Sequence, residues 1–476
     1  MIKDKAPGIQ GAPPQLSMIE SWECLGRWWT EDSEPIPGRL MFSPTDGINL
    51  ELVGTLDPLR ARRAKLGDHT VIWGRTVQGH GMSLFGSLEV ESSLSGSGEK
   101  TSQYKSHWMV LGEHLPASDA VTFHELEVGM FNLEEWIGPS GIVHDTSTEP
   151  PYQSSIRYQQ LPPLKFRIGS FEASAESNGL WNHSVMPPSA GVRVKSIVRF
   201  KTPNVQTLDK FLNGPVRSLQ YFLQLATSSR VPMTSLIGTS KRFVQLLPNG
   251  ESWPVPVPIL FTQKKAVPLP DRKHPANMLF SAMGLGATLP SRMNSWQEGR
   301  DRYPATLDFH FSTGPLDSDV PLEFRFFSAF VACEAYHRAT HSNEQLNPAE
   351  YKRRRELLLS SVKTDPEVFE WANEKILGNE PSARRRLQDL YDEQPEIIRT
   401  LVEDTFIRRA VATRNRGIVH AHNNNPDVFT GRELFRATSL LRLIIQGCLL
   451  REIGFSPEEI GSMVPKITDY RILTTS

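Results

Sequence analysis

Alternating apolar and polar residues form the main pattern between Trp22 and about Trp136. The clearest run is residues 48–53, and it follows Asp46-Gly47, a dipeptide that favours a tight hairpin turn. A period of two places the apolar side chains on one face of a strand. We therefore predict a β-rich region here, with further strands at residues 38–42, 70–73 and 83–85.

A proline-rich stretch at residues 145–163 interrupts this pattern and predicts a connector, with a boundary near residue 155. Strand-like runs resume beyond it, at residues 164–173, 191–200, 243–247 and 255–261. A helical pattern covers residues 205–226, and Pro215 is expected to interrupt that helix. Residues 268–304 contain scattered Pro, Gly and Met, and we predict long loops there.

From about Pro321 the pattern becomes helical, with predicted helices at residues 322–341, 348–362, 366–377, 381–392, 395–421 and 430–453. Several begin with proline in the first turn, where its missing N–H costs nothing. The last helix carries an apolar stripe from Leu434 to Leu449 at helical spacing, which predicts core residues and not a cofactor site. Short connections favour an antiparallel bundle.

These patterns predict an α+β multidomain protein with a β-rich N-terminal region followed by an all-α bundle. We place a loose tail at residues 1–17, a β-rich domain at 18–155, its α+β continuation at 156–315 and the helical domain at 316–476. A hydrophobic content of 39% with 22% charged residues is typical of globular proteins.

The charge balance limits the classes of partner. Lys plus Arg (52) nearly equals Asp plus Glu (53), so any nucleic-acid site must be local. The three cysteines are far apart and form no CxxC pair, which favours a reducing compartment such as the cytoplasm. No apolar run approaches the ~18 residues of a membrane span, so we expect no membrane partner.

Residues 414–420 bring together a permanent cation, an amide and an imidazole, in Arg414, Asn415 and His420. An arginine offers a planar fork of donors to phosphate oxygens, and a histidine can exchange a proton near neutral pH. RNA cleavage by its own 2′-hydroxyl needs a base, an acid and stabilisation of the phosphorane charge, but no divalent ion. Arg-Asn-x4-His resembles the HEPN ribonuclease motif.

We therefore assign His420 as general base, general acid or both, Arg414 as the phosphate-stabilising group and Asn415 as an orienting group. On an uninterrupted helix Arg414 and His420 would lie about 120° apart. Gly417 either loosens the helix for catalysis or marks an inactive copy of the motif. The plain alternative is an arginine and a histidine with ordinary surface roles.

Four further residues are candidate supporting groups for this motif. Glu334 and His337 lie three apart on the first helix of the bundle, and a carboxylate on an apolar stripe needs a partner. Glu334 is predicted to pair with Arg414 or to position His420, unless it simply reaches water. Arg416 and His422 are the other two, and His422 shares a helical face with Asn415.

Metal and cofactor sites are not expected. No third ligand has metal-site spacing around the two histidines of the motif, so we predict no metal. The sequence has no G-x-x-x-x-G-K-[ST] loop and no G-x-S-x-G elbow, and we predict no cofactor. Basic clusters at residues 352–355 and 384–386 either follow phosphates or are solvated faces balanced by acidic neighbours.

An ordered series of short motifs runs through the first third of the chain. Its members are Gly26-Arg27-Trp28-Trp29, Pro37-Gly38-Arg39-Leu40, Leu50-Glu51-Leu52-Val53-Gly54, Ile72-Trp73-Gly74-Arg75-Thr76 and Asn132-Leu133-Glu134-Glu135-Trp136. This series resembles the ApeA-type N-terminal domain that accompanies HEPN domains in bacterial anti-phage proteins. Together with the motif at residues 414–420 the resemblance spans most of the chain, although residues 155–320 add little.

The resemblance implies an abortive-infection effector. Its β-rich region would sense a phage-derived trigger, and its HEPN domain would act as a metal-independent endoribonuclease on tRNA or other single-stranded RNA. Such cleavage leaves 2′,3′-cyclic phosphate and 5′-hydroxyl ends. HEPN domains typically pair, which implies a homodimer or higher oligomer.

Two other interpretations stay open. In one, the bundle is a non-catalytic module that only dimerises or holds RNA. In the other, the β-rich region binds a carbohydrate or a peptide. Trp22, Trp28, Trp29 and Trp73 suit either a core or a binding face, with a core favoured.

Overall fold

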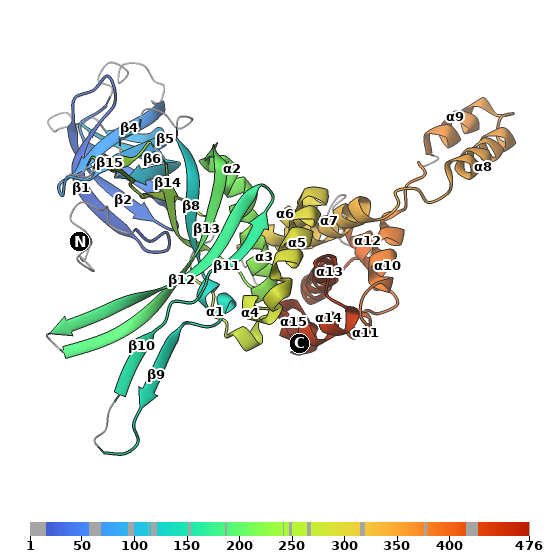
Figure 1. Ribbon diagram of the computed structural model, residues 1–476. Helices are drawn as coiled ribbons and strands as arrows, with labels where there is room; N and C mark the ends of the chain where they lie inside the picture. The colour runs from blue at the N-terminus through green and yellow to red at the C-terminus, as the bar shows by residue number, and fades with distance from the viewer. Residues whose placement is uncertain are drawn as a thin grey trace. The chain divides into compact units, whose positions relative to one another are not determined.

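The computed structural model describes residues 16–56, 68–93, 100–112, 114–115, 121–150, 154–185, 188–240, 242–246, 250–263, 268–314, 319–375, 378–415 and 427–475. Contacts divide the chain into two compact units, Met1–Asn294 and Ser295–Ser476. The first unit is β-rich and the second is helical, as predicted (Figure 1).

Six of the described strands close into an antiparallel barrel in the first unit (Figure 1, blue strands). In barrel order they are β5 (Gly81–Ser93), β4 (Asp68–Thr76), β1 (Trp22–Trp29), β2 (Ile36–Ser43), β3 (Gly47–Val53) and β6 (Thr101–Ser106). Pairing of β6 with β5 completes the circle, so the barrel leaves no free edge between them. The predicted alternation in residues 48–53 is confirmed, because Leu50 and Leu52 are buried while Glu51 is not.

Trp28 fills the interior of the barrel and is fully buried. Two glycines make room for its ring. A Cβ built on Gly74 would lie 2.1 Å from ring carbons of Trp28, and one on Gly38 would lie 3.0 Å from Trp28 Cδ1. Trp73 donates its indole N–H to the Leu115 carbonyl oxygen at 2.7 Å. Trp28 is therefore a core residue, and Trp73 lies at the edge of the core.

The strand β5 belongs to the barrel and also to the sheet beyond it. Its first part pairs with β7 (Trp108–Leu111) and its second part with β6. Gly86 adopts φ 61° between these two parts, a left-handed conformation that glycine reaches without strain. On the side of β5 opposite to β4, the partner strand thus changes from β7 to β6 at one glycine.

Beyond β7 the sheet continues through strands from both sides of residue 155. The order is β17 (Val257–Phe261), β14 (Met233–Thr239), β8 (Thr122–Met130), β13 (Pro188–Thr207), β12 (Phe171–Val185) and β11 (Leu164–Ile168), giving thirteen strands in the described chain. β9 (Ile142–Thr146) and β10 (Ser154–Tyr158) form a separate ribbon, as do β15 (Val244–Leu246) and β16 (Ser252–Pro254). The division predicted near residue 155 does not interrupt this sheet.

Helices cover part of the first unit. Besides the short α1 (Leu133–Ile137), α2 (Leu208–Phe211) and α3 (Arg217–Thr227) are joined by a π-helical turn at Leu212–Val216 that contains Pro215. The interruption predicted at Pro215 is therefore confirmed, although β13 continues to Thr207 and the helical part begins later than expected.

The prediction of long loops at residues 268–304 was wrong. This stretch contains α4 (Ala282–Leu285) and α5 (Leu289–Arg302). Met293 and Trp296 of α5 are fully buried, although the helix also contains the poor helix formers Ser295 and Gly299. Burial of the two large side chains outweighs this weak propensity.

The second unit is a helical bundle. Its helices are α6 (Pro304–Ser312), α7 (Leu322–Thr340), α8 (Pro348–Ser361), α9 (Pro366–Lys375), α10 (Ala383–Asp392), α11 (Glu396–Arg399), α12 (Phe406–Ala412), α13 (Gly431–Glu452), α14 (Pro457–Met463) and α15 (Thr468–Thr475). The stripe predicted from Leu434 to Leu449 is buried in α13, which packs against α7 and α15. None of the helices in the described part of the chain combines the length and apolar character that a membrane crossing needs.

The single helix predicted at residues 395–421 was wrong in its described part. α11 ends at Arg399 and α12 begins only at Phe406. The intervening residues include Thr400, Val402 and Asp404, whose side chains favour a helix less than Leu or Ala does. Residues 416–421 lie outside the described residues.

Candidate active site

Arg414 and Asn415 lie on a π-helical turn that continues α12 over residues 413–415. Such turns are wider than an α-helix and occur often at functional sites. Thr413 is buried, donates to the Arg409 carbonyl oxygen at 2.8 Å and accepts from the Phe429 N–H at 2.9 Å. The second bond joins the two sides of the segment 416–426, which lies outside the described residues.

The Arg414 guanidinium is held by three groups. Its Nη2 donates to Glu334 Oε2 at 3.4 Å, and its Nη1 donates to Asn415 Oδ1 at 2.9 Å. The cation also lies 5.9 Å from the centre of the Phe330 ring. Phe330 and Glu334 are four residues apart on α7, so one face of that helix presents both to Arg414.

This arrangement orients Arg414 without covering it. The Glu334 side chain is 13% exposed, whereas the Arg414 side chain keeps 35% exposure. The Nε of Arg414 is buried, and no described group accepts from it. A guanidinium has five N–H donors, and the described contacts occupy two of them. The two remaining Nη donors suit phosphate oxygens.

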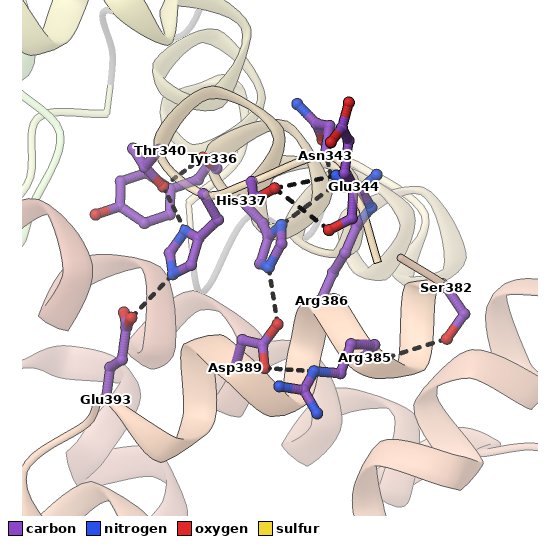
Figure 2. Close-up of polar contacts among 12 residues, drawn as sticks. Tyr336, His337, Thr340, Asn343, Glu344, Ser382, Arg385, Arg386, Asp389 and Glu393 are labelled. Atoms are coloured by element: carbon purple, nitrogen blue, oxygen red, sulfur yellow. Dashed lines mark hydrogen bonds and ion pairs between the residues drawn. The ribbon is translucent and has the colours of Figure 1, made fainter. Parts of the chain in front are cut away.

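His337, the other candidate on α7, lies in a different network (Figure 2). It is 1% exposed, and its Nδ1 accepts from Arg386 Nη1 at 3.1 Å. Its Nε2 donates to Asp389 Oδ2 at 3.1 Å. Burial lowers the pKa of His337 more than the hydrogen bond to Asp389 raises it, so the ring is neutral with its proton on Nε2.

Arg386 anchors this second network and is itself 1% exposed. Its Nη1 also donates to Asn343 Oδ1 at 2.8 Å, and its Nη2 donates to Glu380 Oε2 at 3.2 Å. The cluster ties α7 to α10, and no described hydrogen bond links it to Arg414. His337 is therefore placed as a packing residue of the bundle.

Most residues of the basic clusters seen in the sequence have a carboxylate partner in the structure. Arg353 and Arg354 both contact Glu350 at 2.7 Å, and their hydrogen bonds lower the pKa of Glu350 to about 2. Arg386 is buried and Arg385 contacts Asp389 at 2.8 Å. The burial of Arg386 could have been suspected from Leu390, which lies four residues further along α10 and is also buried.

Of the predicted site residues, the structure brings together Arg414, Asn415 and Glu334. Phe330, which sequence reasoning missed, joins them, and its position four residues before Glu334 was the available signal. Arg416, Gly417, His420 and His422 lie outside the described residues. In the part of the chain that is described, no group of three or more His, Cys, Asp or Glu side chains is arranged to hold a metal ion.

Comparison with known families gives two matches. The family described as ApeA N-terminal domain 1 matches residues 23–296, which is more than half of the chain. The family described as Apea-like HEPN matches residues 327–459, a range that includes Glu334 and the motif at 414–420. No curated protein and no solved structure matches the chain.

Proposed function

The chain belongs to the ApeA family, with an ApeA N-terminal domain 1 followed by an Apea-like HEPN domain, and from this we propose an anti-phage effector that cuts RNA. HEPN domains are generally ribonucleases. In this proposal the β-rich unit detects a phage-derived component and the helical unit cuts tRNA or other single-stranded RNA, in the cytoplasm.

The observation that supports the proposal most directly is the set of contacts that orients the Arg414 guanidinium. Glu334, Asn415 and Phe330 orient the guanidinium while leaving it 35% exposed. Donors that are fixed before the reaction stabilise developing charge without reorganisation. This supports Arg414 as the group that meets the phosphorane oxygens.

His420 belongs to the segment 416–426. This segment comes between Thr413 and Phe429, which are joined by a hydrogen bond. That bond is 2.9 Å long, so Phe429, on the far side of the segment, lies beside Thr413, the residue before Arg414. We therefore propose that His420 reaches the same phosphate as Arg414. Arg416 and His422 stay candidate supporting residues in that segment.

The proposed reaction is a transesterification. A base takes the 2′-hydroxyl proton, the 2′-oxygen forms a bond to phosphorus, and the bond from phosphorus to the 5′-oxygen breaks as an acid protonates it. The products are a 2′,3′-cyclic phosphate and a 5′-hydroxyl. One histidine supplies either the base or the acid, so a homodimer that brings two copies of the motif together completes the pair.

A second candidate is favoured by the carboxylate of Glu334. Because Glu334 offsets part of the charge of Arg414, it weakens the stabilisation that Arg414 can give to a developing oxyanion, which suits a module that holds RNA without cutting it. The two candidates differ in product formation and not in RNA affinity.

The test is cleavage of total tRNA and of a single-stranded RNA by the purified full chain in EDTA, with end-group analysis. We expect cleavage by the native chain and none by His420→Ala or Arg414→Ala, with equal folding by circular dichroism. Arg408→Ala is the matched control, because Arg408 lies on α12 but pairs with Asp427. Undiminished cleavage by His420→Ala would overturn its role. RNA binding without cleavage, in the presence of phage lysate as well, would establish the second candidate.

A further inference from the structure

A cavity of about 790 Å³ lies on the wall of the barrel, over β4, β1, β2, β3 and β6. This volume falls in the range of about 300–1,000 Å³ that is usual for ligand sites. The barrel interior itself is filled by Trp28 and its neighbours. The cavity is therefore a feature of the wall and not a gap in the core.

Cross-strand pairing arranges the lining side chains in two rows. In the first row, Arg39 pairs in register with Leu25 on one side and Glu51 on the other, and Val77 donates its N–H to the Leu25 carbonyl oxygen at 3.0 Å. The second row contains Arg75, Arg27, Pro37, Val53 and Thr101. Both rows cross several strands at right angles to the chain direction.

Arg27 and Arg75 are direct partners in the pairing of β1 with β4. Like charges at directly opposed positions destabilise a sheet unless an anion lies between them. No carboxylate of the described residues pairs with either guanidinium, and Arg27 makes only a 3.5 Å bond to the Pro35 carbonyl oxygen. Arg39 differs, because it pairs with Glu23 and lowers the pKa of that carboxylate. Among the described residues, the positive charge that lacks a paired carboxylate is thus concentrated at one end of the cavity.

The rest of the lining combines polar residues, among them Arg39, Glu51 and Gln103, with exposed apolar side chains. Leu25 is 61% exposed, Val77 is 76% exposed and Val53 is 46% exposed. Apolar side chains gathered in this way gain from being covered. None of the residues that line the cavity, all of them described, is aromatic, so no ring is present to stack a nucleobase. The chemistry favours a carboxylate ligand with aliphatic groups over a nucleic acid.

We propose that this wall binds an extended peptide segment of a partner protein. A carboxylate of the peptide lies against Arg27 and Arg75, and its aliphatic side chains cover Leu25, Val77 and Val53. Five strands spaced by about 4.8 Å span roughly 19 Å, the length of about six extended residues. Both an acidic side chain and a free C-terminus supply such a carboxylate.

Peptide binding does not depend on RNA cleavage. Only its interpretation as recognition of a phage protein rests on the proposed function. A direct binding measurement therefore separates the two, because it fails or succeeds without any nuclease activity.

The experiment measures fluorescence anisotropy with the full chain and labelled peptides of about six residues built from Ser and Leu. One peptide carries an internal Glu and an amidated C-terminus, the second has no Glu and a free C-terminus, and the third has neither. We expect at least one carboxylate peptide to bind, and the comparison of the first two identifies the source of the carboxylate. The third should bind at least about tenfold more weakly.

Charge reversal tests the site. Arg27→Glu and Arg75→Glu should each weaken binding by at least about tenfold. Arg167→Glu is the matched control, since Arg167 is exposed on β11 and does not line the cavity. In Arg75→Glu the new carboxylate faces Arg27, so Tm should stay or rise while binding is lost. A purely structural role for Arg75 predicts the opposite shift in Tm.

Three outcomes would overturn the proposal. The first is equal binding of the neutral and carboxylate peptides, and the second is binding by none of them. The third is tighter binding of a mixed-sequence ribo-oligonucleotide than of any peptide, with loss in the same arginine variants, which would assign the wall to nucleic acid.

Discussion

The carboxylate of Glu334 lies 3.4 Å from the guanidinium of Arg414, although 80 residues separate them in the sequence. The pair connects the middle of α7 to the turn after α12. It fixes the direction of the cation, and its carboxylate also competes with a phosphate for the same donors.

Glu334→Gln keeps the shape of the side chain and removes its charge. RNA affinity should rise by roughly threefold to tenfold, because one negative charge near the phosphate is lost. Single-turnover cleavage should fall by about tenfold as the guanidinium loses its orientation. Filter binding and single-turnover kinetics measure the two effects, with Glu323→Gln, exposed on the same helix, as control. Unchanged affinity and rate would show that the pair only supports the fold.

Arg414→Lys retains the positive charge and removes the planar fork of donors. Cleavage should fall by about 10²-fold, the effect of losing one preorganised donor to a developing oxyanion, while RNA affinity changes little. Arg408→Lys on α12 is the matched control. If Arg414→Lys cleaved at the native rate, the site would need charge alone.

His337 makes the stability of the helical unit depend on pH. Burial lowers its pKa below the ordinary value, so the unfolded chain binds the proton more readily than the folded chain. The contribution of His337 to the free energy of unfolding is fully present above pH ~6.5. It is lost as the pH falls through the lowered pKa. Calorimetry from pH 8 to 5 should show Tm decreasing on acidification.

His337→Gln provides the comparison. The variant should be less stable at neutral pH by about 1–3 kcal/mol, because the buried Arg386 loses the ring nitrogen Nδ1 that accepts from its Nη1, and its Tm should vary less with pH. His183→Gln, at an exposed position of β12, should leave both quantities unchanged. An equal pH dependence in native and His337→Gln chains would contradict this account.

Gly74→Ala tests the filling of the barrel. The added Cβ would lie 2.1 Å from the Trp28 ring, so we expect a loss of about 1–3 kcal/mol or more in the free energy of unfolding. Gly191→Ala is the control, since a Cβ there meets nothing within 4 Å. Denaturant unfolding measures both. Adding Trp28→Leu should recover part of the loss caused by Gly74→Ala, and a purely additive effect would exclude the clash.

Local patterns predicted those features that depend on one face of one element. The alternation around Leu50 and the stripe beginning at Leu434 both report burial directly, and both were confirmed. The partner of the buried Arg386 is His337, 49 residues away, and no local pattern identifies that partner. The helix α5 was missed for the same reason, because the burial of Trp296 outweighs the propensity of its neighbours.

The candidate site likewise contains residues that the sequence could predict and contacts that it could not. Residue types and spacing identified Arg414 and Asn415, and the need of a carboxylate for a partner identified Glu334. Spacing alone could not show that His337, one turn further along α7, contacts α10 and not α12. Three residues of helix change the direction of a side chain enough to place it against a different neighbour.

The change of partner at Gly86 has a mechanical consequence for the first unit. The strand β5 belongs both to the barrel and to the open sheet. A deformation of the barrel at β5 would therefore also move β7. An occupant that pushed the wall at β4 would displace β5 through their shared hydrogen bonds. That displacement would reach β17 and β14 along the same continuous ladder, whereas a flexible linker would have absorbed it.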